Sequence, residues 1–345
     1  MQEKLKNIFK NKKILVTGGT GCIGGEIVRR LLPFKPDVVR IFSNDEDNTF
    51  RMMQELGIRK EVRFLVGDIR DKERLIQAME GIDIVYHAAA LKHVPLCEYN
   101  PFEAIKTNVL GTQNVIESSL FSGVSKVISI STDKAVNPAN TMGATKLLAE
   151  KLIIDANFYK GKSRTIFSCV RFGNVLFSRG SVIPLFIDQI KNQKMITITD
   201  ESMTRFMMSI ENTIDLVFKS TIMAKGGEIF ILKMPVVKMG DVADVVIDKI
   251  CKECGFVKSK VKKKKIGPRS GEKMYEELMT ENESEKAFET KDMFIIPPTS
   301  DFQNGEYLVK NYSNAKKSKM QSYASRDVKI LNKSEIQKML FGKSK

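Results

Sequence analysis

Up to about residue 170 the chain alternates short, β-branched apolar runs with longer amphipathic stretches, and this alternation constrains the fold more than any other feature. The runs lie at residues 13–17, 38–42, 62–66, 84–87, 127–131 and 165–170. Their nearly continuous apolar character is typical of strands that are buried on both faces. Strands that alternate with helices through right-handed crossovers form a parallel sheet. The sequence therefore predicts an α/β, doubly wound Rossmann fold.

After residue 171 the alternation becomes less regular. Helix-like segments at 182–192, 210–223 and 241–255 alternate with strand-like segments at 196–199, 229–232 and 261–266. This pattern predicts a smaller, mixed α/β domain that closes over the first. We expect a dinucleotide-binding domain with the catalytic residues at 1–172, a mainly substrate-binding domain at 173–310, and a C-terminal tail at 311–345 that docks on the protein or contacts another subunit.

The formal net charge of +15 favours an anionic partner such as nucleic acid, lipid headgroups or a phosphorylated small molecule. The densest basic stretch, 258–265, lacks interleaved aromatic residues and is not a basic amphipathic helix. We therefore expect no nucleic-acid partner. No apolar run is long enough to span a bilayer, and the first 13 residues are charged throughout instead of containing a signal-peptide core. These features predict a cytoplasmic protein without membrane insertion.

Five scattered cysteines do not form the framework of a secreted disulfide-rich domain and fit a reducing compartment. Cys251 and Cys254 make one C-x-x-C pair, without a second Cys or His pair nearby to complete a tetrahedral zinc site. We interpret the pair as structural and predict no metal.

A glycine-rich loop follows the first apolar run and opens a helix-like segment that extends to Leu32. Gly18, Gly21 and Gly24 permit a tight turn and a close approach of the backbone to a pyrophosphate, whose charge a helix N-terminus favours. The strand before the loop and the helix after it disfavour the alternative of a purely structural turn. The loop predicts a dinucleotide cofactor, with further contacts from Thr20, Cys22 and Ile23.

The next two strand ends are expected to bind the adenosine half of that cofactor. The residues concerned are Ser43, Asn44, Asp45, Asp68 and Ile69. Asp45 or Asp47 can bind the ribose hydroxyls, whereas a 2′-phosphate would need a cation such as Arg40 or Arg51. Asp68 can accept a hydrogen bond from the adenine amino group, although capping the following helix explains it equally well.

Two short motifs carry groups for proton transfer. Thr132, Asp133 and Lys134 follow the fifth strand, and adjacent opposite charges in a partly dry cleft shift each other's pKa. Met142 and Lys146 are four residues apart, which places them on one face of a helix. Because Met142 has no proton to exchange, Asp133 and Lys134 are the candidates for acid and base.

Taken together, the motifs resemble the extended short-chain dehydrogenase/reductase superfamily and, within it, the UDP-N-acetylglucosamine 4,6-dehydratases of polysaccharide biosynthesis. The motifs are the glycine loop, Asp68 with Arg70, residues 87–95, Asn108, residues 131–138, Met142 with Lys146, and residues 171–175, 178–184 and 203–206. They extend over nearly the whole chain. The tail from Tyr323 to Leu340 is similar to that of the soluble capsule type, which also epimerises carbon 5.

The resemblance implies an enzyme with a tightly bound NADP or NAD, a UDP-sugar substrate and a homo-oligomeric state, either a dimer or a higher assembly such as a hexamer. In this family a hydride leaves carbon 4 of the sugar, water is eliminated across carbons 5 and 6, and the hydride returns to carbon 6. Relatives commonly have Arg at the position of Asn44, where it clamps the 2′-phosphate of NADP, so the choice of NADP or NAD stays open. The configuration at carbon 5 is open as well.

The resemblance also implies roles in proton transfer. Met142 stands where most of the superfamily has the Tyr that deprotonates the substrate, so Met142 fills that volume without its function. Thr132 would bind the 4-oxygen, Lys134 would remove the carbon 5 proton, and Asp133 would protonate the departing 6-hydroxyl. We expect Asp133 to take the 4-hydroxyl proton too, with Lys134 as the alternative. Lys146 would hold the nicotinamide ribose.

Further binding residues follow from the same resemblance and from the need for cations, amides and a helix N-terminus around a diphosphate. Those expected to contact the cofactor are Ala88, Ala89, Ala90, Lys92, Asn108 and Lys146. Those expected to contact the nucleotide sugar are Lys92, His93, Asn174, Arg179, Ser181, Val182, Thr199, Arg205 and Glu272. His93 has a structural alternative. The alternative functions are a nucleotide-sugar 4-epimerase or oxidoreductase, and a non-catalytic nucleotide-binding regulator.

Overall fold

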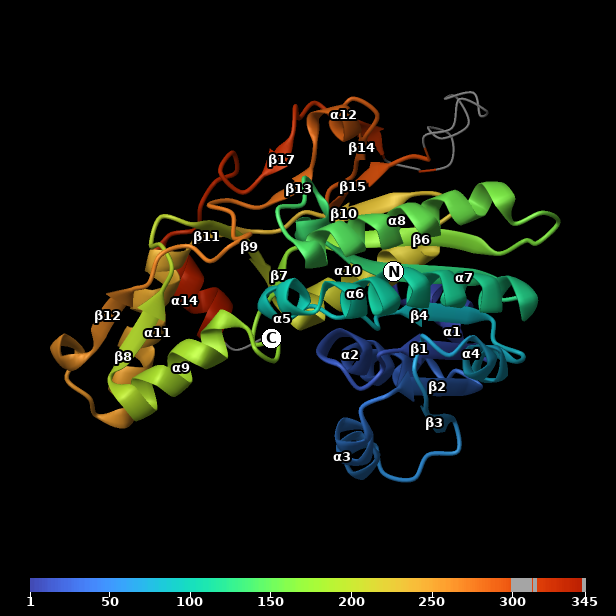
Figure 1. Cartoon of the computed structure of the whole chain (residues 1–345), viewed down its shortest axis with the longest axis horizontal. Coiled ribbons are helices and arrows are strands. Elements are labelled where there is room, and N and C mark those ends of the chain that lie inside the picture. Colours follow the sequence, from blue (N-terminus) through green and yellow to red (C-terminus); the bar gives the residue numbers. More distant parts are fainter. Residues whose placement is uncertain (299–311, 313–314, 343–345) are drawn as a thin grey trace.

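The computed structural model describes residues 1–298, 312 and 315–342. Within these residues a ten-stranded sheet forms the larger part of the molecule, and a smaller lobe lies at one end of it (Figure 1). The parallel strands, in spatial order, are β3 (Val62–Val66), β2 (Val38–Ser43), β1 (Lys13–Thr17), β4 (Ile84–His87), β5 (Lys126–Thr132), β6 (Ile166–Phe172) and β10 (Ile229–Leu232). The strand order reverses at β1, so the prediction of a doubly wound parallel sheet is confirmed.

One predicted strand lies in a different place from the one that the sequence suggested. The run 229–232 was expected in the smaller domain, but β10 pairs in parallel with β6 and all four of its residues are buried. Its continuous apolar character is that of a central strand with both faces covered. Beyond β10 the sheet continues with antiparallel strands, which are β15 (Met293–Ile296), β14 (Phe288–Glu289) and β16 (Lys316–Lys317). The large sheet therefore receives strands from both sides of residue 172, and the division at residues 172 and 310 stays a prediction.

Helices cover both faces of the sheet (Figure 1). On one face α4 (Lys72–Met79) packs beside α7 (Gly111–Phe121), which packs beside α8 (Thr141–Tyr159). On the other face α10 (Ile210–Met223) contacts both α2 (Cys22–Leu31) and α1 (Gln2–Phe9). The aromatic rings of Phe9, Tyr86 and Phe218 meet in the core beneath these helices.

The smaller lobe has an apolar core of its own. It is built from α9 (Val182–Gln193), α11 (Met239–Cys254), α14 (Lys333–Phe341) and a parallel pair of strands, β8 (Met195–Ile198) and β12 (Lys262–Lys265). Ile336 and Leu340 of α14 are buried in this core, where the helix contacts α11. The C-terminal helix thus docks on the smaller lobe, while part of the predicted tail (residues 311, 313–314 and 343–345) lies outside the described residues.

Further elements complete the two parts and the connections between them. They are η1 (Leu32–Phe34), α3 (Glu46–Leu56), α5 (Val94–Tyr99), α6 (Pro101–Ala104), the π-helix η2 (Ile105–Leu110), η3 (Asp133–Ala135), β7 (Asn174–Val175), β9 (Thr204–Met208), β11 (Val236–Lys238), η4 (Lys258–Lys260), β13 (Glu277–Met279), α12 (Glu281–Ser284) and β17 (Tyr323–Ala324). The strands β11, β9 and β7 form a three-stranded sheet beneath the site, and β13 pairs with β17. Among the described residues no helix is both long enough and apolar enough to cross a membrane.

A buried ion cluster fixes one of these connections to the large sheet. Arg171, near the end of β6, is 1% exposed and forms ion pairs with Glu150 of α8 and Glu283 of α12. Its guanidinium also donates a hydrogen bond to the backbone oxygen of Leu278 in β13, at 2.8 Å. The segment that runs from β13 to α12 is therefore tied to β6.

Candidate active site

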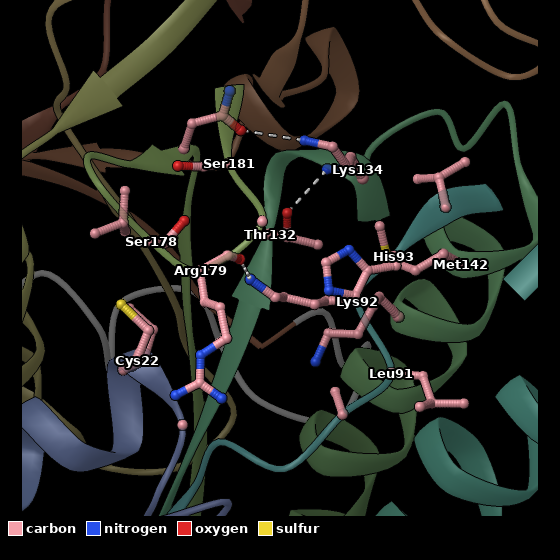
Figure 2. A pocket seen from close by; sticks show the side chains of 18 of the residues that line it. Cys22, Leu91, Lys92, His93, Thr132, Lys134, Met142, Ser178, Arg179 and Ser181 are labelled. Carbon is pink, nitrogen blue, oxygen red and sulfur yellow. Dashed lines mark hydrogen bonds between the residues drawn. The ribbon is translucent and has the colours of Figure 1, made fainter. Parts of the chain in front are cut away.

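A cavity of about 810 Å³ lies at the carboxyl ends of the central parallel strands and extends towards the smaller lobe. Ligand sites in open α/β sheets occur at this edge, where the strand order reverses. Residues from the glycine loop, from the segments after β2, β4, β5 and β6, and from the start of α9 line it. Figure 2 shows the glycine-loop residue Cys22 on one side and Thr132, Lys134 and Met142 across the cavity from it.

The glycine loop has the geometry that was predicted for it. Gly18 has φ +62°, and a Cβ atom there would lie 2.8 Å from the backbone of Ala89. A Cβ on Gly24 would lie 2.3 Å from the carbonyl oxygen of Gly18. Glycine is therefore required at both positions, because the loop folds tightly on itself and against the segment after β4. The loop also brings Thr20, Gly21, Cys22 and Ile23 to the cavity wall.

The predicted adenosine-binding residues line the same groove. They are Ser43, Asn44, Asp45, Asp68 and Ile69. Asn44 donates a hydrogen bond to Asp68 at 3.0 Å, and Arg70 pairs with Asp68 at 2.7 Å. Although burial raises it, the pKa of Asp68 is lowered overall by the hydrogen bonds from Arg70 and Asn44. Asp68 thus presents an ionised carboxylate at this end of the groove.

Two alternatives considered for this region are wrong. Asp71, not Asp68, caps α4, because its side chain accepts the hydrogen bond from the Arg74 amide. Arg40 does not line the groove, since its guanidinium donates hydrogen bonds to the carbonyl oxygens of Ala78 and Glu80 at 2.9 and 2.8 Å. Arg40 is therefore committed to backbone contacts rather than to a 2′-phosphate.

The segment after β4 forms the floor between the two halves of the cavity, and Ala88, Ala89, Ala90, Lys92 and His93 line it. Asn108 was expected to touch the cofactor, but it is 1% exposed and does not line the cavity. Its side chain instead bonds to the amide and the carbonyl of Leu91, at 2.8 and 3.0 Å. Asn108 thus holds this segment in place from behind.

His87 is part of the buried wall. Its ring nitrogens share hydrogen bonds with Thr17 and Thr112, at 2.8 and 3.0 Å. Burial, with a smaller effect of the Lys146 charge, lowers the pKa of His87 to about 3. The imidazole is therefore neutral at physiological pH and already bonded on both sides.

Thr132, Asp133 and Lys134 form a compact cluster at the end of β5. The Thr132 hydroxyl and the Lys134 ammonium both donate to Oδ1 of Asp133, each at 2.9 Å. Thr132 and Lys134 line the cavity, whereas Asp133 is fully buried and does not. Lys134 also reaches the side-chain oxygen of Asn174 at 3.4 Å (Figure 2). The other carboxylate oxygen of Asp133, Oδ2, has no hydrogen-bond partner among the described residues and lies near Gly173 of the cavity wall.

Met142 and Lys146 lie on the first turns of α8, beside this cluster. Met142 is 3% exposed, lines the cavity and packs against Cys97 and Ala104. The Lys146 ammonium donates to the carbonyl oxygen of Ile130 at 2.7 Å, and burial lowers its pKa. Met142 therefore supplies apolar packing where Lys146 supplies a charge.

The predicted sugar-nucleotide residues converge from three segments. Thr199 donates to Glu272 at 3.4 Å, and Arg205 lies 3.6 Å from the same carboxylate. Arg205 is buried, and its guanidinium also donates to the carbonyl oxygens of Lys273 and Thr204, each at 2.8 Å. The structure thus brings these residues together, with Arg205 anchoring the loop that carries Glu272.

The loop before α9 covers the glycine loop. Lys92 donates to the carbonyl oxygen of Arg179 at 2.7 Å (Figure 2), and the Arg179 guanidinium reaches Asn48 at the start of α3, at 2.9 Å. Ser181, which precedes Val182 at the N-terminus of α9, has a buried hydroxyl without a hydrogen-bond partner in the described part of the chain. A free hydroxyl, a helix N-terminus and two cations make this region suited to an anion.

Sequence reasoning missed Glu276, which lines the cavity and is 4% exposed. Its Oε1 lies 3.7 Å from the Lys134 ammonium and 3.7 Å from Nε of Arg205. Burial raises the pKa of Glu276, although the charge of Lys134 opposes this. The pKa of Lys134 is raised by the carboxylates of Asp133 and Glu276, which outweigh its burial. The one signal in the sequence was the position of Glu276 four residues after Glu272.

The family model described as polysaccharide biosynthesis protein matches residues 14–298, so the chain belongs to this family. A protein of Methanocaldococcus jannaschii named as an uncharacterized membrane protein is 52% identical over 99% of this chain and 98% of its own length. A UDP-glucose 4-epimerase of Rickettsia bellii is 41% identical over 96% of each chain. A UDP-N-acetylglucosamine 4,6-dehydratase (inverting) of Campylobacter jejuni is 42% identical over 86% of this chain and 85% of its own.

Among solved structures, Pen from Bacillus thuringiensis is 48% identical and superposes with a TM-score of 0.89, covering 95% of this chain and 96% of that one. These relatives, together with the sheet and the cavity at its carboxyl edge, place the chain among the nucleotide-sugar dehydratases and epimerases of the extended short-chain dehydrogenase/reductase superfamily.

Proposed function

We propose that the protein is a 4,6-dehydratase that acts on UDP-N-acetylglucosamine and yields a UDP-4-keto-6-deoxy-hexosamine for surface polysaccharide or glycan biosynthesis. The observation that carries this proposal is the Thr132, Asp133 and Lys134 cluster beside the cavity. Elimination of water needs an acid and a base at carbons 5 and 6, which oxidation and reduction at carbon 4 alone do not. The Campylobacter relative named for this activity supports the choice.

The dinucleotide in this proposal is NAD or NADP. The loop at Gly18, the adenosine groove with Asp68, and Lys146 fit such a group, because they offer a backbone cradle, a ribose or adenine acceptor and a cation at the far end. When bound, it accepts a hydride from carbon 4 and returns it at carbon 6. Denaturing the purified protein and weighing the released dinucleotide distinguishes NAD from NADP.

The first proton transfer would use Thr132 as a bridge. Asp133 is fully buried and does not line the cavity. The Thr132 hydroxyl lines the cavity and donates to Asp133 at 2.9 Å, so it can pass a proton from the 4-hydroxyl to that carboxylate. Met142 then needs no role beyond filling space.

The elimination would use Lys134 at carbon 5. Its ammonium lies at the cavity wall between two carboxylates, and a proton must leave it before it can act as a base. The acid at the 6-oxygen was assigned to Asp133 by the sequence prediction. Whether the proton at carbon 5 returns to the other face, as in an inverting enzyme, is checked by proton NMR of the fresh product in deuterated water.

The nucleotide would lie against the smaller lobe. In this arrangement the diphosphate meets the N-terminus of α9 with Ser181 and the cations Lys92 and Arg179, while Glu272 accepts hydrogen bonds from the ribose. We also propose a homo-oligomer, because Tyr99 at the end of α5 and Phe102 at the start of α6 expose 86% and 61% of their surfaces. Light scattering measures its size.

The test of the reaction is incubation with UDP-N-acetylglucosamine followed by mass spectrometry. We expect a product that is lighter by one water. The second candidate is a 4-epimerase, which the name of the Rickettsia relative favours. An epimerase would give a product of unchanged mass and a new configuration at carbon 4, and it would also convert UDP-glucose. Unchanged sugar with bound dinucleotide would instead indicate a non-catalytic protein.

A further inference from the structure

The outer end of the smaller lobe is strongly basic, and the cavity does not account for this charge. The basic tip, as we name residues 249–265, comprises the last turns of α11, η4 and β12. Figure 1 shows β12 at the end of the smaller lobe that lies away from the large sheet. The basic tip contains eight lysines and one acidic residue, so it concentrates about half of the formal net charge of +15. A charge of this density attracts an anionic partner.

The lysines along β12 fall into two groups. Lys263 and Lys265 form ion pairs with carboxylates of neighbouring segments, at 2.6 and 2.7 Å. Lys262 and Lys264 point to the opposite face, because successive side chains of a strand alternate. Both are exposed, as is Lys260 just before the strand, and the side chains of these three form no ion pair or hydrogen bond with the described residues. One face of the strand is therefore neutralised, and the other presents free cations.

The acidic residues near the basic tip do not neutralise these free lysines. Glu253 pairs with Lys249 at 3.1 Å, and Asp248, which precedes the tip, pairs with Lys258. Lys252 adds a further exposed ammonium in the last turn of α11. The surface thus presents several cations whose nearest carboxylates are already engaged with other lysines.

An exposed apolar side chain lies among these cations. Val257, between α11 and η4, exposes 56% of its surface. Its neighbour Phe256 is the one aromatic residue of the basic tip, and it packs against the core of the smaller lobe beneath the Lys194 ammonium. Single-stranded nucleic acid is bound by exposed aromatic rings that stack on its bases. A layer of lipid headgroups instead accepts an apolar side chain that is flanked by cations.

Two structural roles explain some of these lysines but not the whole surface. Lysines on an edge strand discourage pairing with another chain, and β12 is an edge strand of its two-stranded sheet. A lysine in the last turn of a helix, such as Lys252, interacts favourably with the helix dipole. Neither role requires an exposed Val257 beside three ammonium groups without an acidic partner. These features together indicate a surface that meets a partner.

The strands β8 and β12 extend from the basic tip to the cavity. Met195 and Lys262, at which their pairing begins, lie at the tip, whereas Thr199 and Ile266, just beyond their other ends, line the cavity. At about 3.3 Å per residue, the strands hold the cavity wall about 13 Å from the tip. A surface that contacts the tip therefore leaves the cavity uncovered.

We propose that the basic tip docks the protein on the surface of a membrane that contains anionic lipids. In this arrangement the ammonium groups of Lys260, Lys262 and Lys264 meet lipid phosphates, and Val257 enters the headgroup layer. The contact is peripheral and inserts no helix, and it does not depend on which reaction the cavity supports. Attraction between ammonium groups and a charged surface falls off within a Debye length, about 10 Å at about 0.1 M ionic strength, so added salt should release the protein.

The experiment measures how much of the full chain sediments with vesicles of phosphatidylcholine, either alone or mixed equally with phosphatidylglycerol. We expect binding to the mixed vesicles only, with release as the salt concentration is raised to about 0.5 M. A variant that combines Lys260→Gln, Lys262→Gln and Lys264→Gln should bind the mixed vesicles about 10²-fold more weakly, because each lysine near an anionic surface contributes about fivefold. Val257→Ser should weaken binding by about fivefold, because it removes apolar surface from the contact.

The matched control combines Lys4→Gln, Lys6→Gln and Lys10→Gln, three exposed lysines on and next to α1. It loses the same charge on the larger part of the molecule and should bind the mixed vesicles as wild type does. An equal loss in the control would overturn the proposal, since binding would then follow net charge instead of the basic tip.

Two results with wild-type protein would also overturn the proposal. One is equal binding to both kinds of vesicle, or to neither. The other is binding to duplex DNA without binding to vesicles, which would make the basic tip a nucleic-acid surface. The Tm of each variant shows that it is folded. Should the variant at Lys260, Lys262 and Lys264 not fold, Val257→Ser decides, because an unchanged affinity for mixed vesicles would exclude contact at the tip.

Discussion

Replacing Thr132 with Val tests whether the buried carboxylate works through its neighbour. Val keeps the shape and the β-branching of Thr at the last position of β5 and removes the hydroxyl that donates to Asp133 at 2.9 Å. Asp133 keeps its hydrogen bond from Lys134, so its Oδ1 atom is not left unpaired. The Thr132 hydroxyl also accepts a long hydrogen bond from the Lys134 amide, at 3.4 Å. The expected loss of folding free energy is therefore that of these two bonds, about 1–2 kcal/mol. In a protein of this size that corresponds to a shift in Tm of about 2 °C.

The effect on the reaction should be much larger. Without the hydroxyl the proposed bridge from the 4-oxygen to Asp133 is lost, and loss of a general base typically costs about 10²–10³-fold, which is about 2.7–4 kcal/mol. The assay is a single turnover with UDP-N-acetylglucosamine, monitored by the absorbance of the reduced nicotinamide. Thr132→Ser, which retains a hydroxyl, is the matched control and should stay within about tenfold of wild type. A normal rate of carbon 4 oxidation in Thr132→Val would refute the bridging role.

The other predictions concern packing, charge and pH. Met142→Leu should keep turnover within a few-fold, because a packing role tolerates a swap of similar volume; a steady-state assay that finds the enzyme inactive would contradict this. Asp133→Asn should abolish turnover while the dinucleotide remains bound, as measured by mass spectrometry of the denatured protein; near-normal turnover would exclude Asp133 from the reaction. Arg171→Met leaves the buried Glu150 and the partly buried Glu283 without their cation and should lower the free energy of unfolding in urea by about 3–5 kcal/mol, so a wild-type urea midpoint would contradict a structural role. The folded-state pKa of Glu276 is raised, so the contribution of this carboxyl to the stability of the wild-type protein is lost as pH rises from about 4 through that pKa. The Tm of Glu276→Gln, relative to that of wild type, should therefore increase from acid to neutral pH. A difference in Tm that does not depend on pH would contradict the raised pKa.

The parallel sheet and the glycine loop could be predicted because each rests on local sequence. A strand buried on both faces must be largely apolar, and the runs at 13–17 and 84–87 coincide with β1 and β4, in which only Lys13 is not buried. Gly18 and Gly24 are dictated by contacts within one short loop and its neighbouring strand. The position of β10 could not be predicted in the same way. An apolar run indicates burial but not the strand beside which it lies, and β10 pairs with β6 across more than 50 residues of chain.

The candidate site shows the same division between what sequence determines and what tertiary packing determines. Adjacency in sequence correctly grouped Thr132, Asp133 and Lys134, but it does not say which of them meet a cavity. Successive side chains at the end of a strand point in different directions. Thr132 and Lys134 consequently line the site while Asp133 is buried between them.

Glu276 was missed for the complementary reason. It is more than 140 residues from Lys134 in the chain, and its approach depends on the pairing of β13 with β17 and on the hydrogen bond from Arg171 to that segment. Apart from the spacing between Glu272 and Glu276, local patterns carry no trace of such a contact. The motif at the end of β5 shows one carboxylate beside Lys134, and the fold brings a second one to the same ammonium.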